Sequence, residues 1–303
     1  MMPEADLWPI SDTWHYHDLL NGLHEYVNAV DRLYGKAEGL DDFCRKVQLI
    51  NYDSYRAMFE SWNSRLWDNT SGVLLWMSHP AWPSVEWQTY SWDYETFGSY
   101  YGSRKACEPV HIQMNLDDRD VILVNTSTNA LDALTASLAC YDLDGKKIFS
   151  RTEKGISLAA NSKKEIFKAE NDDINGTYIL RLTLSDNKGR NLSVNDYILR
   201  GQGIEDYQAL NAVPQGKVKA RRLNQSADGK CRFEISNAGR SIALNLKLNL
   251  RDTSTGDIIL PAYFSDGYFH LLPGEKRIIE ISSPSEGSIS VEGYNVPQQT
   301  IIK

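Results

Sequence analysis

The sequence has 303 residues, enough for two or three domains that each bury a core of their own. Its 42% hydrophobic and 24% charged residues are ordinary for a globular protein and argue against wholesale disorder. No apolar run approaches the ~20 residues of a membrane-spanning helix, and the N-terminal stretch MMPEADLWP lacks the basic and apolar parts of a signal peptide. We therefore expect no membrane partner.

The net charge of −8 lies entirely in the first third of the chain. Residues 1–109 carry 8 Lys and Arg against 16 Asp and Glu, whereas residues 110–303 carry 24 of each. Basic clusters interleaved with stacking aromatics are missing from the sequence, so we expect no nucleic-acid partner. The four cysteines have neither C-x-x-C spacing nor neighbouring histidines, so we expect no bound metal and no disulfide framework.

The tryptophans follow the same division, because all eight precede residue 93. The densest stretch, LLWMSHPAWPSVEWQTYSWDY at residues 74–94, contains four of them together with two tyrosines. We call residues 74–94 the aromatic segment, and we expect function on this side of the chain.

The first predicted element is a helix over residues 41–66. Its apolar positions recur in steps of three and four residues, at Phe43, Val47, Ile50, Phe59 and Trp62. A breaker cluster at 69–72 follows, and the run GVLLWM then predicts a strand over 73–77 that is buried on both faces. Helix, buried strand and long aromatic loop is the order of one α/β-barrel unit. The helix face is expected to pack on this strand, and a strand without its barrel neighbours would present an open edge.

From about residue 110 the pattern changes to alternating strands separated by tight turns. The runs DVILVNTS, LTASLACYDL, YILRLTLSD and LSVNDYILR predict one antiparallel sandwich. After a linker at QGIEDYQALNAVPQGKV, the runs KCRFEIS, ALNLKLNLRD, IEIS and SISVEGY predict a second. Each half has the size of an immunoglobulin-like sandwich.

The two halves also repeat each other at an offset of about 111 residues. Asn125 aligns with Asn237 after the first strand, and Gly145 aligns with Gly256 in the next turn. Two copies indicate paired sandwiches, because a solenoid needs at least three repeats.

Two quoted stretches carry a resemblance to glycoside hydrolase family 2, in its exo-β-glucosaminidase and β-mannosidase branch. MMPEADLWPISDTWHYHDL resembles the loop after the nucleophile strand, and SGVLLWMSHPAWPSVEWQTYSWDYETFGSYYGSRKACEPVHIQ resembles the eighth barrel strand and its exit. The resemblance implies a mainly β chain. Residues 1–109 would be the C-terminal piece of the (β/α)8 catalytic (TIM) barrel, followed by immunoglobulin-like antiparallel sandwiches at 110–205 and 206–303.

The same resemblance implies a sugar-binding role for the aromatic segment. Trp76 matches the tryptophan that forms the floor of the non-reducing sugar subsite, and Trp82 lies in the following loop; Trp87 and Trp92 are weaker candidates. Aromatic faces pack on the C–H groups of sugars, although such rings also pack against neighbouring domains. His79 is a further candidate because the SHP step replaces the family's asparagine-containing step, which leaves the exact sugar open.

The retaining mechanism needs two carboxylates ~5–5.5 Å apart. The family's positions for them, after the fourth and seventh strands, would both precede residue 1, so we assign no catalytic residue to this chain. The acids of the first segment match neither position: Glu4, Asp6, Asp12, Asp18, Glu86, Asp93 and Glu95.

The resemblance thus predicts a fragment that completes the pocket and supports the barrel of a retaining exo-glycosidase. The parent would release terminal β-linked mannose or glucosamine from a β-linked glycan without a cofactor, with the upstream barrel and N-terminal domains as partners. Export to the periplasm or the medium would bring the parent enzyme to its glycan substrate, but the sequence does not assign a compartment. One alternative is a stand-alone carbohydrate-binding or adhesive sandwich module, which the lack of sandwich tryptophans disfavours. Another is a small complete hydrolase, which turnover of an aryl β-glycoside by this chain would reveal.

Overall fold

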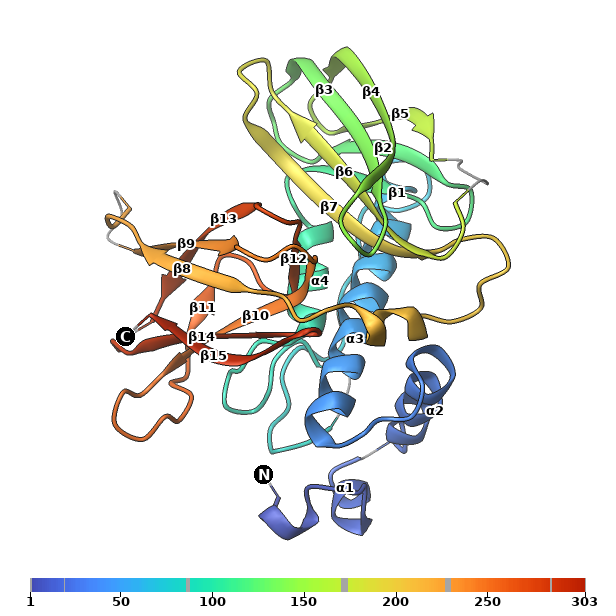
Figure 1. The fold of residues 1–303 in the computed structure, drawn as a ribbon. Helices are drawn as coiled ribbons and strands as arrows, with labels where there is room; N and C mark the ends of the chain where they lie inside the picture. The colour runs from blue at the N-terminus through green and yellow to red at the C-terminus, as the bar shows by residue number, and fades with distance from the viewer. Residues whose placement is uncertain are drawn as a thin grey trace. The chain divides into compact units, whose positions relative to one another are not determined.

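The computed structural model describes residues 2–18, 20–85, 88–169, 174–226, 230–283 and 285–302 (Figure 1). The chain divides into two compact units, each taken here by itself. The first consists of Met1–Tyr52, Trp76–Tyr101 and Asp206–Lys303, and the second of Asp53–Leu75 and Gly102–Glu205. Among the described helices, none is both long and apolar enough to cross a membrane.

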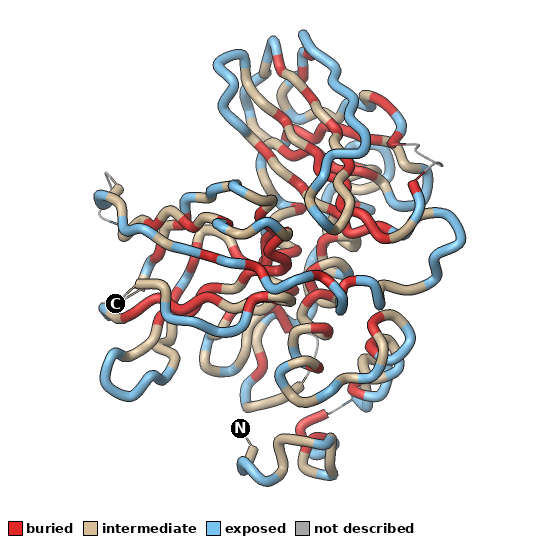
Figure 2. Tube along the Cα trace, viewed as in Figure 1, coloured by how far each residue is buried: buried red, intermediate tan, exposed pale blue. Residues whose placement is uncertain are grey.

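The second unit contains a sandwich of two antiparallel sheets. One sheet has the order β1 (Val110–Met114), β2 (Asp120–Asn125), β5 (Ser162–Lys168). The other has the order β4 (Lys147–Leu158), β3 (Leu131–Tyr141), β6 (Thr177–Ser185), β7 (Asn191–Arg200). Side chains of both sheets meet in one core, which includes Met114 and Leu123 from the first and Leu138 and Leu182 from the second. Figure 2 shows this burial along the strands.

The first unit begins with the helical elements. These are η1 (Glu4–Asp6), α1 (Asp12–Tyr16), α2 (Leu23–Tyr34) and α3 (Leu40–Asn63), of which residues 40–52 belong to this unit. The helix α4 (Gly98–Ala106) begins against α3, because a Cβ at Gly98 would lie 2.3 Å from the Gln48 carbonyl oxygen. Only glycine fits there.

The bounds of α3 confirm the helix predicted over 41–66, which ends three residues earlier than predicted.

The first unit also contains the other antiparallel sandwich, after the short helix η2 (Gln208–Ala212). One sheet has the order β12 (Phe269–Leu271), β10 (Ala243–Arg251), β14 (Ser288–Gly293), β15 (Val296–Ile302). Its partner has the order β11 (Tyr263–Phe264), β13 (Lys276–Ser282), β9 (Cys231–Asn237), β8 (Val218–Arg222). Leu246, Leu248, Phe233 and Ile279 fill the core between them. Both predicted sandwiches are confirmed.

The repeat is present in atomic detail. Asn125 is fully buried; its side-chain oxygen accepts the Ser127 amide at 3.0 Å, and its side-chain nitrogen donates to the carbonyls of Asn129 (2.9 Å) and Ala159 (2.8 Å). Asn237 bonds the residues at the same sequence distances, two, four and thirty-four positions on. It accepts the Gly239 amide at 2.9 Å and donates to the carbonyls of Ser241 (2.8 Å) and Leu271 (2.9 Å). The aligned asparagines therefore perform the same task, which is to tie one strand end to a turn and to a later strand.

The strand predicted over 73–77 was wrong. Those residues have no regular secondary structure, and Leu74 is 97% exposed. A strand exists only through hydrogen bonds to a neighbour, and no described strand pairs with 73–77. The helix face consequently packs elsewhere, since Phe43 lies 5.7 Å from the ring of Trp8 and 6.2 Å from that of Trp14, centroid to centroid. Trp62, from the same predicted face, is 45% exposed.

A buried polar network joins the C-terminal part of α3 to the sandwich within the second unit. His111 lies between two carboxylates, with Nε2 3.2 Å from Glu60 Oε1 and Nδ1 3.1 Å from Glu108 Oε2. Glu60 also accepts hydrogen bonds from Asn195 (2.6 Å) and Tyr197 (2.9 Å). Glu60 and His111 are both buried, so their role is to hold the helix on the sheet.

Candidate functional site

In the first aromatic cluster, Trp82 packs against Tyr16 and His17 at the end of α1. The His17 ring stacks on Trp82 at 5.2 Å between centroids and 27° between planes, and Tyr16 meets the same indole edge-on at 5.6 Å. The loop is fixed by the backbone, because the Val85 amide donates to the His17 carbonyl at 3.0 Å. We call Tyr16, His17 and Trp82 the His17 stack. Trp82 keeps 37% of its surface exposed, so one part of the stack faces solvent.

The second cluster forms around His79. Its ring lies on Tyr94 at 4.9 Å and only 9° from parallel, with Tyr90 at 5.2 Å. The carbonyl of Trp92 lies 3.3 Å from Nε2 of His79. When Nε2 carries the proton and donates to that carbonyl, Nδ1 is left as an acceptor. We call His79, Tyr90 and Tyr94 the His79 stack, and Tyr94 is 48% exposed.

A short hairpin carries the second cluster. Tyr90 and Thr96 form an antiparallel bridge, and the Ser91 amide donates to the Glu95 carbonyl at 2.9 Å. Glu95 also forms an ion pair with Lys247 of β10, and both side chains are largely buried. Burial alone would lower the pKa of Lys247, but Tyr268 and the Glu95 carboxylate outweigh it and raise that pKa. The hairpin is thus attached to the sandwich of its own unit through a charged pair.

The remaining tryptophans of the aromatic segment differ in their surroundings. Trp76 is 80% exposed, and its peptide bond to Met77 is cis. Trp92 is 43% exposed. Trp87, a weaker candidate, lies outside the described residues. The structure therefore places Trp76, Trp82 and His79 on one connected segment, with the latter two in separate stacks.

Four residues of these stacks were not among the predicted site residues: Tyr16, His17, Tyr90 and Tyr94. Their signal was present in the aromatic run WHYH and in the end of the aromatic segment, but ring stacking between residues 65 positions apart in sequence is a tertiary contact. No periodicity reveals it.

Four acids of the first segment have side-chain partners in the structure: Asp6, Asp18, Asp93 and Glu95. Asp18 is buried and accepts the amides of Gly22 and Leu23, each at 2.9 Å. Asp6 accepts the Thr13 hydroxyl at 3.0 Å, and Asp93 accepts the Ser91 hydroxyl. Glu86 lies outside the described residues. Over the described residues, no three His, Cys, Asp or Glu side chains gather as a metal site would require.

Comparisons with known proteins agree on both sandwiches. The family model for the exo-β-D-glucosaminidase Ig-fold domain matches residues 196–296, and the one for the mannosidase Ig/CBM-like domain matches residues 117–200. An exo-β-D-glucosaminidase of Amycolatopsis orientalis is 29% identical over 99% of this chain. A mannosylglycoprotein endo-β-mannosidase of Lilium longiflorum is 27% identical over 94%. The chain spans 33% and 37% of these two relatives.

Solved structures extend the agreement to the whole chain. The crystal structure of an Amycolatopsis orientalis exo-chitosanase matches with a TM-score of 0.88 and 29% identity, over 100% of this chain and 40% of that one. A β-D-mannosidase of Dictyoglomus thermophilum matches with a TM-score of 0.77 at 19% identity, which supports the fold alone.

This chain contains two Ig-type sandwiches, one matching a glucosaminidase domain model and the other a mannosidase domain model. Together with the aromatic segment, they define the chain as a portion of a multidomain glycoside hydrolase. The chain corresponds to the C-terminal part of a glycoside hydrolase family 2-type enzyme, similar to exo-β-glucosaminidases and mannosidases.

Proposed function

We propose that this chain is the C-terminal part of a retaining exo-glycosidase that releases terminal β-linked glucosamine or mannose. The relatives that match nearly all of this chain are described as exo-β-D-glucosaminidases and a mannosidase, which supports this substrate class. The two carboxylates of a retaining mechanism would come from the remainder of the enzyme. Among the acids of the first segment, Asp6 accepts a hydroxyl, Asp18 accepts backbone amides and Glu95 forms an ion pair.

The observation that carries the proposal is the position of the exposed ring faces. Trp76, Trp82 and the His79 stack all belong to the stretch that resembles the exit of the eighth barrel strand, and catalytic sites of α/β barrels form at that end. Indole and phenol faces pack on sugar C–H groups while excluding water. The chain would thereby supply a wall of the sugar pocket.

Each residue has a distinct proposed role. Trp76 offers the most exposed indole and would form the floor beneath the terminal sugar. Trp82, held on edge and face by the His17 stack, would form a side wall. His79, with Nε2 directed at the Trp92 carbonyl, would accept a hydrogen bond from a sugar hydroxyl at Nδ1.

The experiment compares this chain alone with the same chain joined to the missing part of the enzyme. Aryl β-glucosaminide, β-mannoside and β-galactoside are the substrates. We expect no turnover by the 303 residues alone, and turnover of the glucosaminide or mannoside by the joined enzyme. In the joined enzyme, Trp76→Ala should lower kcat/KM by about tenfold or more, because a stacked ring contributes ~1–2 kcal/mol. The control Trp62→Ala removes another exposed indole, which lies on α3 and is 45% exposed, and should leave kcat/KM unchanged.

The proposal would be refuted if the 303-residue chain alone hydrolysed a substrate and this activity co-purified with the chain through every chromatographic step. A joined enzyme in which Trp76→Ala and Trp62→Ala have the same effect would also refute it.

A further inference from the structure

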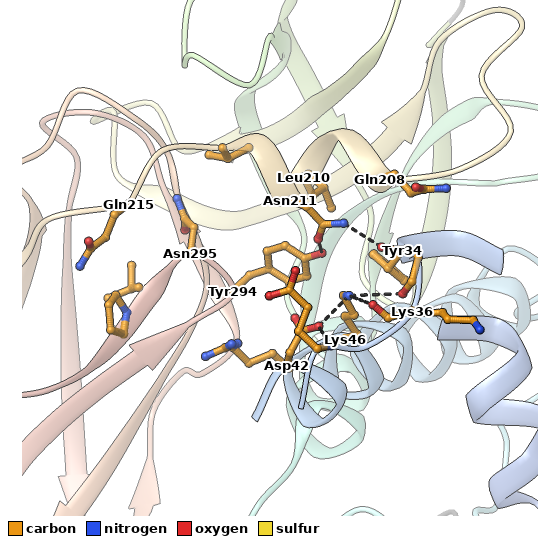
Figure 3. Close-up of a pocket in the computed structure, with 16 residues that line it drawn as sticks. Tyr34, Lys36, Asp42, Lys46, Gln208, Leu210, Asn211, Gln215, Tyr294 and Asn295 are labelled. Atoms are coloured by element: carbon orange, nitrogen blue, oxygen red, sulfur yellow. Dashed lines mark hydrogen bonds and ion pairs between the residues drawn. The ribbon is translucent and has the colours of Figure 1, made fainter. Parts of the chain in front are cut away.

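The first unit contains a cavity of about 680 Å³, and no residue of the His17 stack or the His79 stack lines it. This volume falls within the range of small-molecule sites. Its walls come from the end of α2 and the start of α3, from η2, and from the turn between β14 and β15 (Figure 3).

One wall is an aromatic and amide frame. Tyr34 is buried, with ring centroids of Tyr207 at 5.6 Å and Tyr294 at 6.2 Å. Asn211 links the two sides: its side-chain nitrogen donates to the Tyr34 carbonyl at 2.7 Å, and its oxygen accepts the Tyr294 hydroxyl at 2.6 Å. Figure 3 shows Asn211 between these two tyrosines. The Tyr294 ring is therefore held in place beside the cavity.

The opposite wall is charged and belongs to α3. The buried ammonium of Lys46 donates to Asp42 Oδ2 at 2.8 Å and to the carbonyls of Gly35 (3.3 Å) and Lys36 (3.4 Å). These three bonds use all three donors of Lys46. Lys46 thus fixes one oxygen of Asp42, while Oδ1 has no recorded partner among the described residues.

Arg45 completes this wall. It lines the cavity, and no hydrogen bond or ion pair joins its guanidinium to another described residue. Asp42 and Arg45 are three positions apart on α3, so their side chains lie on one face of the helix. Burial raises the pKa of the Tyr294 hydroxyl, with Asp42 raising it further and Arg45 lowering it, which is consistent with both charges lying near that ring.

We propose that this cavity is a second saccharide site, in which Arg45 and Asp42 hold neighbouring hydroxyls and the Tyr294 ring packs against the sugar. A carboxylate only accepts hydrogen bonds and a guanidinium only donates them, whereas each sugar hydroxyl does both. Two adjacent hydroxyls therefore complement this pair, and the volume accommodates one or two sugar units. The choice of sugar rests on the proposed function, whereas the site itself rests on the cavity.

The test titrates the 303-residue chain with a β-1,4-linked glucosamine dimer and with β-1,4-mannobiose, following backbone amides by NMR. We expect at least one of them to shift amides at the start of α3 and around Tyr294. Arg45→Met, which keeps the aliphatic stem, should raise the Kd for that sugar by about tenfold, the usual loss for a hydrogen bond to a charged group. The matched control Arg32→Met removes an exposed arginine of α2 that does not line the cavity, and it should leave the Kd unchanged.

Trp76→Ala separates this site from the aromatic segment. Binding that survives Trp76→Ala but weakens in Arg45→Met supports the second site, whatever the enzymatic assay shows. Binding that is lost in Trp76→Ala and unaffected in Arg45→Met overturns the proposal and leaves the proposed function intact. Failure of both sugars to bind overturns it as well, as does Arg45-dependent binding of inorganic phosphate alone.

Discussion

Replacement of the repeated asparagines should destabilise both sandwiches by similar amounts. Asn125→Ala and Asn237→Ala each remove the three matching hydrogen bonds of 2.8–3.0 Å from a buried position. Asn125→Ala also removes the bond that the partly buried Ser127 hydroxyl donates at 2.7 Å. A typical buried hydrogen bond contributes about 1 kcal/mol net, and partners left without water cost more. Three bonds lost at once give a decrease of about 3–4 kcal/mol in the free energy of unfolding at each site.

The assay is native-state hydrogen exchange read by mass spectrometry, which reports the opening free energy of each strand separately. Asn125→Ala should weaken protection in strands β1–β7, and Asn237→Ala in strands β8–β15. The control Asn187→Ala, at an exposed turn position, should change the opening free energy by less than about 0.5 kcal/mol.

An aspartate variant sharpens the test. Asn237→Asp keeps the oxygen that accepts the Gly239 amide, but its second carboxylate oxygen faces the carbonyl oxygens of Ser241 and Leu271 and repels them. At pH 7 this variant should lower the free energy of unfolding at least as much as Asn237→Ala. A loss below about 1 kcal/mol at either site, or a loss that spreads equally over both sandwiches, would refute the equivalence of the two copies.

Two further predictions concern buried charges. Burial alone would lower the pKa of His111, but its bonds to Glu108 and Glu60 outweigh this and raise it; the stabilisation is therefore complete below pH ~6.5 and lost as pH rises through the raised value. Burial alone would raise the pKa of Glu108, but His111 and Lys105 lower it to about 2. Its contribution is therefore complete above the ordinary value of 4.5 and is lost as pH falls from there toward 2. Urea midpoints from pH 6 to pH 9 should fall more steeply in the native chain than in His111→Gln, and parallel slopes would contradict this. Lys247→Met strands the Glu95 carboxylate and should cost about 3 kcal/mol, part of which Glu95→Gln restores in the double variant; purely additive losses in urea unfolding would exclude a coupled pair.

The elements that were predictable are those whose signal is local or repeated. Steps of three and four residues located α3, and alternation located the strands of both sandwiches. Asn125 and Asn237 were found because the same turn occurs twice, so the alignment revealed what one copy would have hidden.

Elements that depend on a partner were not predictable. The run at 73–77 has the composition of a buried strand, but no described strand pairs with it, and Leu74 is exposed instead. Ion pairs between distant residues were not predictable either. Glu95 and Lys247 lie 152 positions apart in the sequence, and no spacing rule connects them.

The proposed sugar-binding surface of the aromatic segment is built largely without regular secondary structure. Rigid rings carry few rotatable bonds, so stacking His79 on Tyr94 and Trp82 on His17 fixes large faces at a small cost in side-chain entropy. The backbone between them is held by a few bonds, among them the Thr89 amide to the Ser78 carbonyl at 3.1 Å. Such a surface is already ordered before a sugar arrives, so binding pays little for ordering it. Because the rings and their anchors lie within one unit, the proposed recognition would be measurable in this chain by itself.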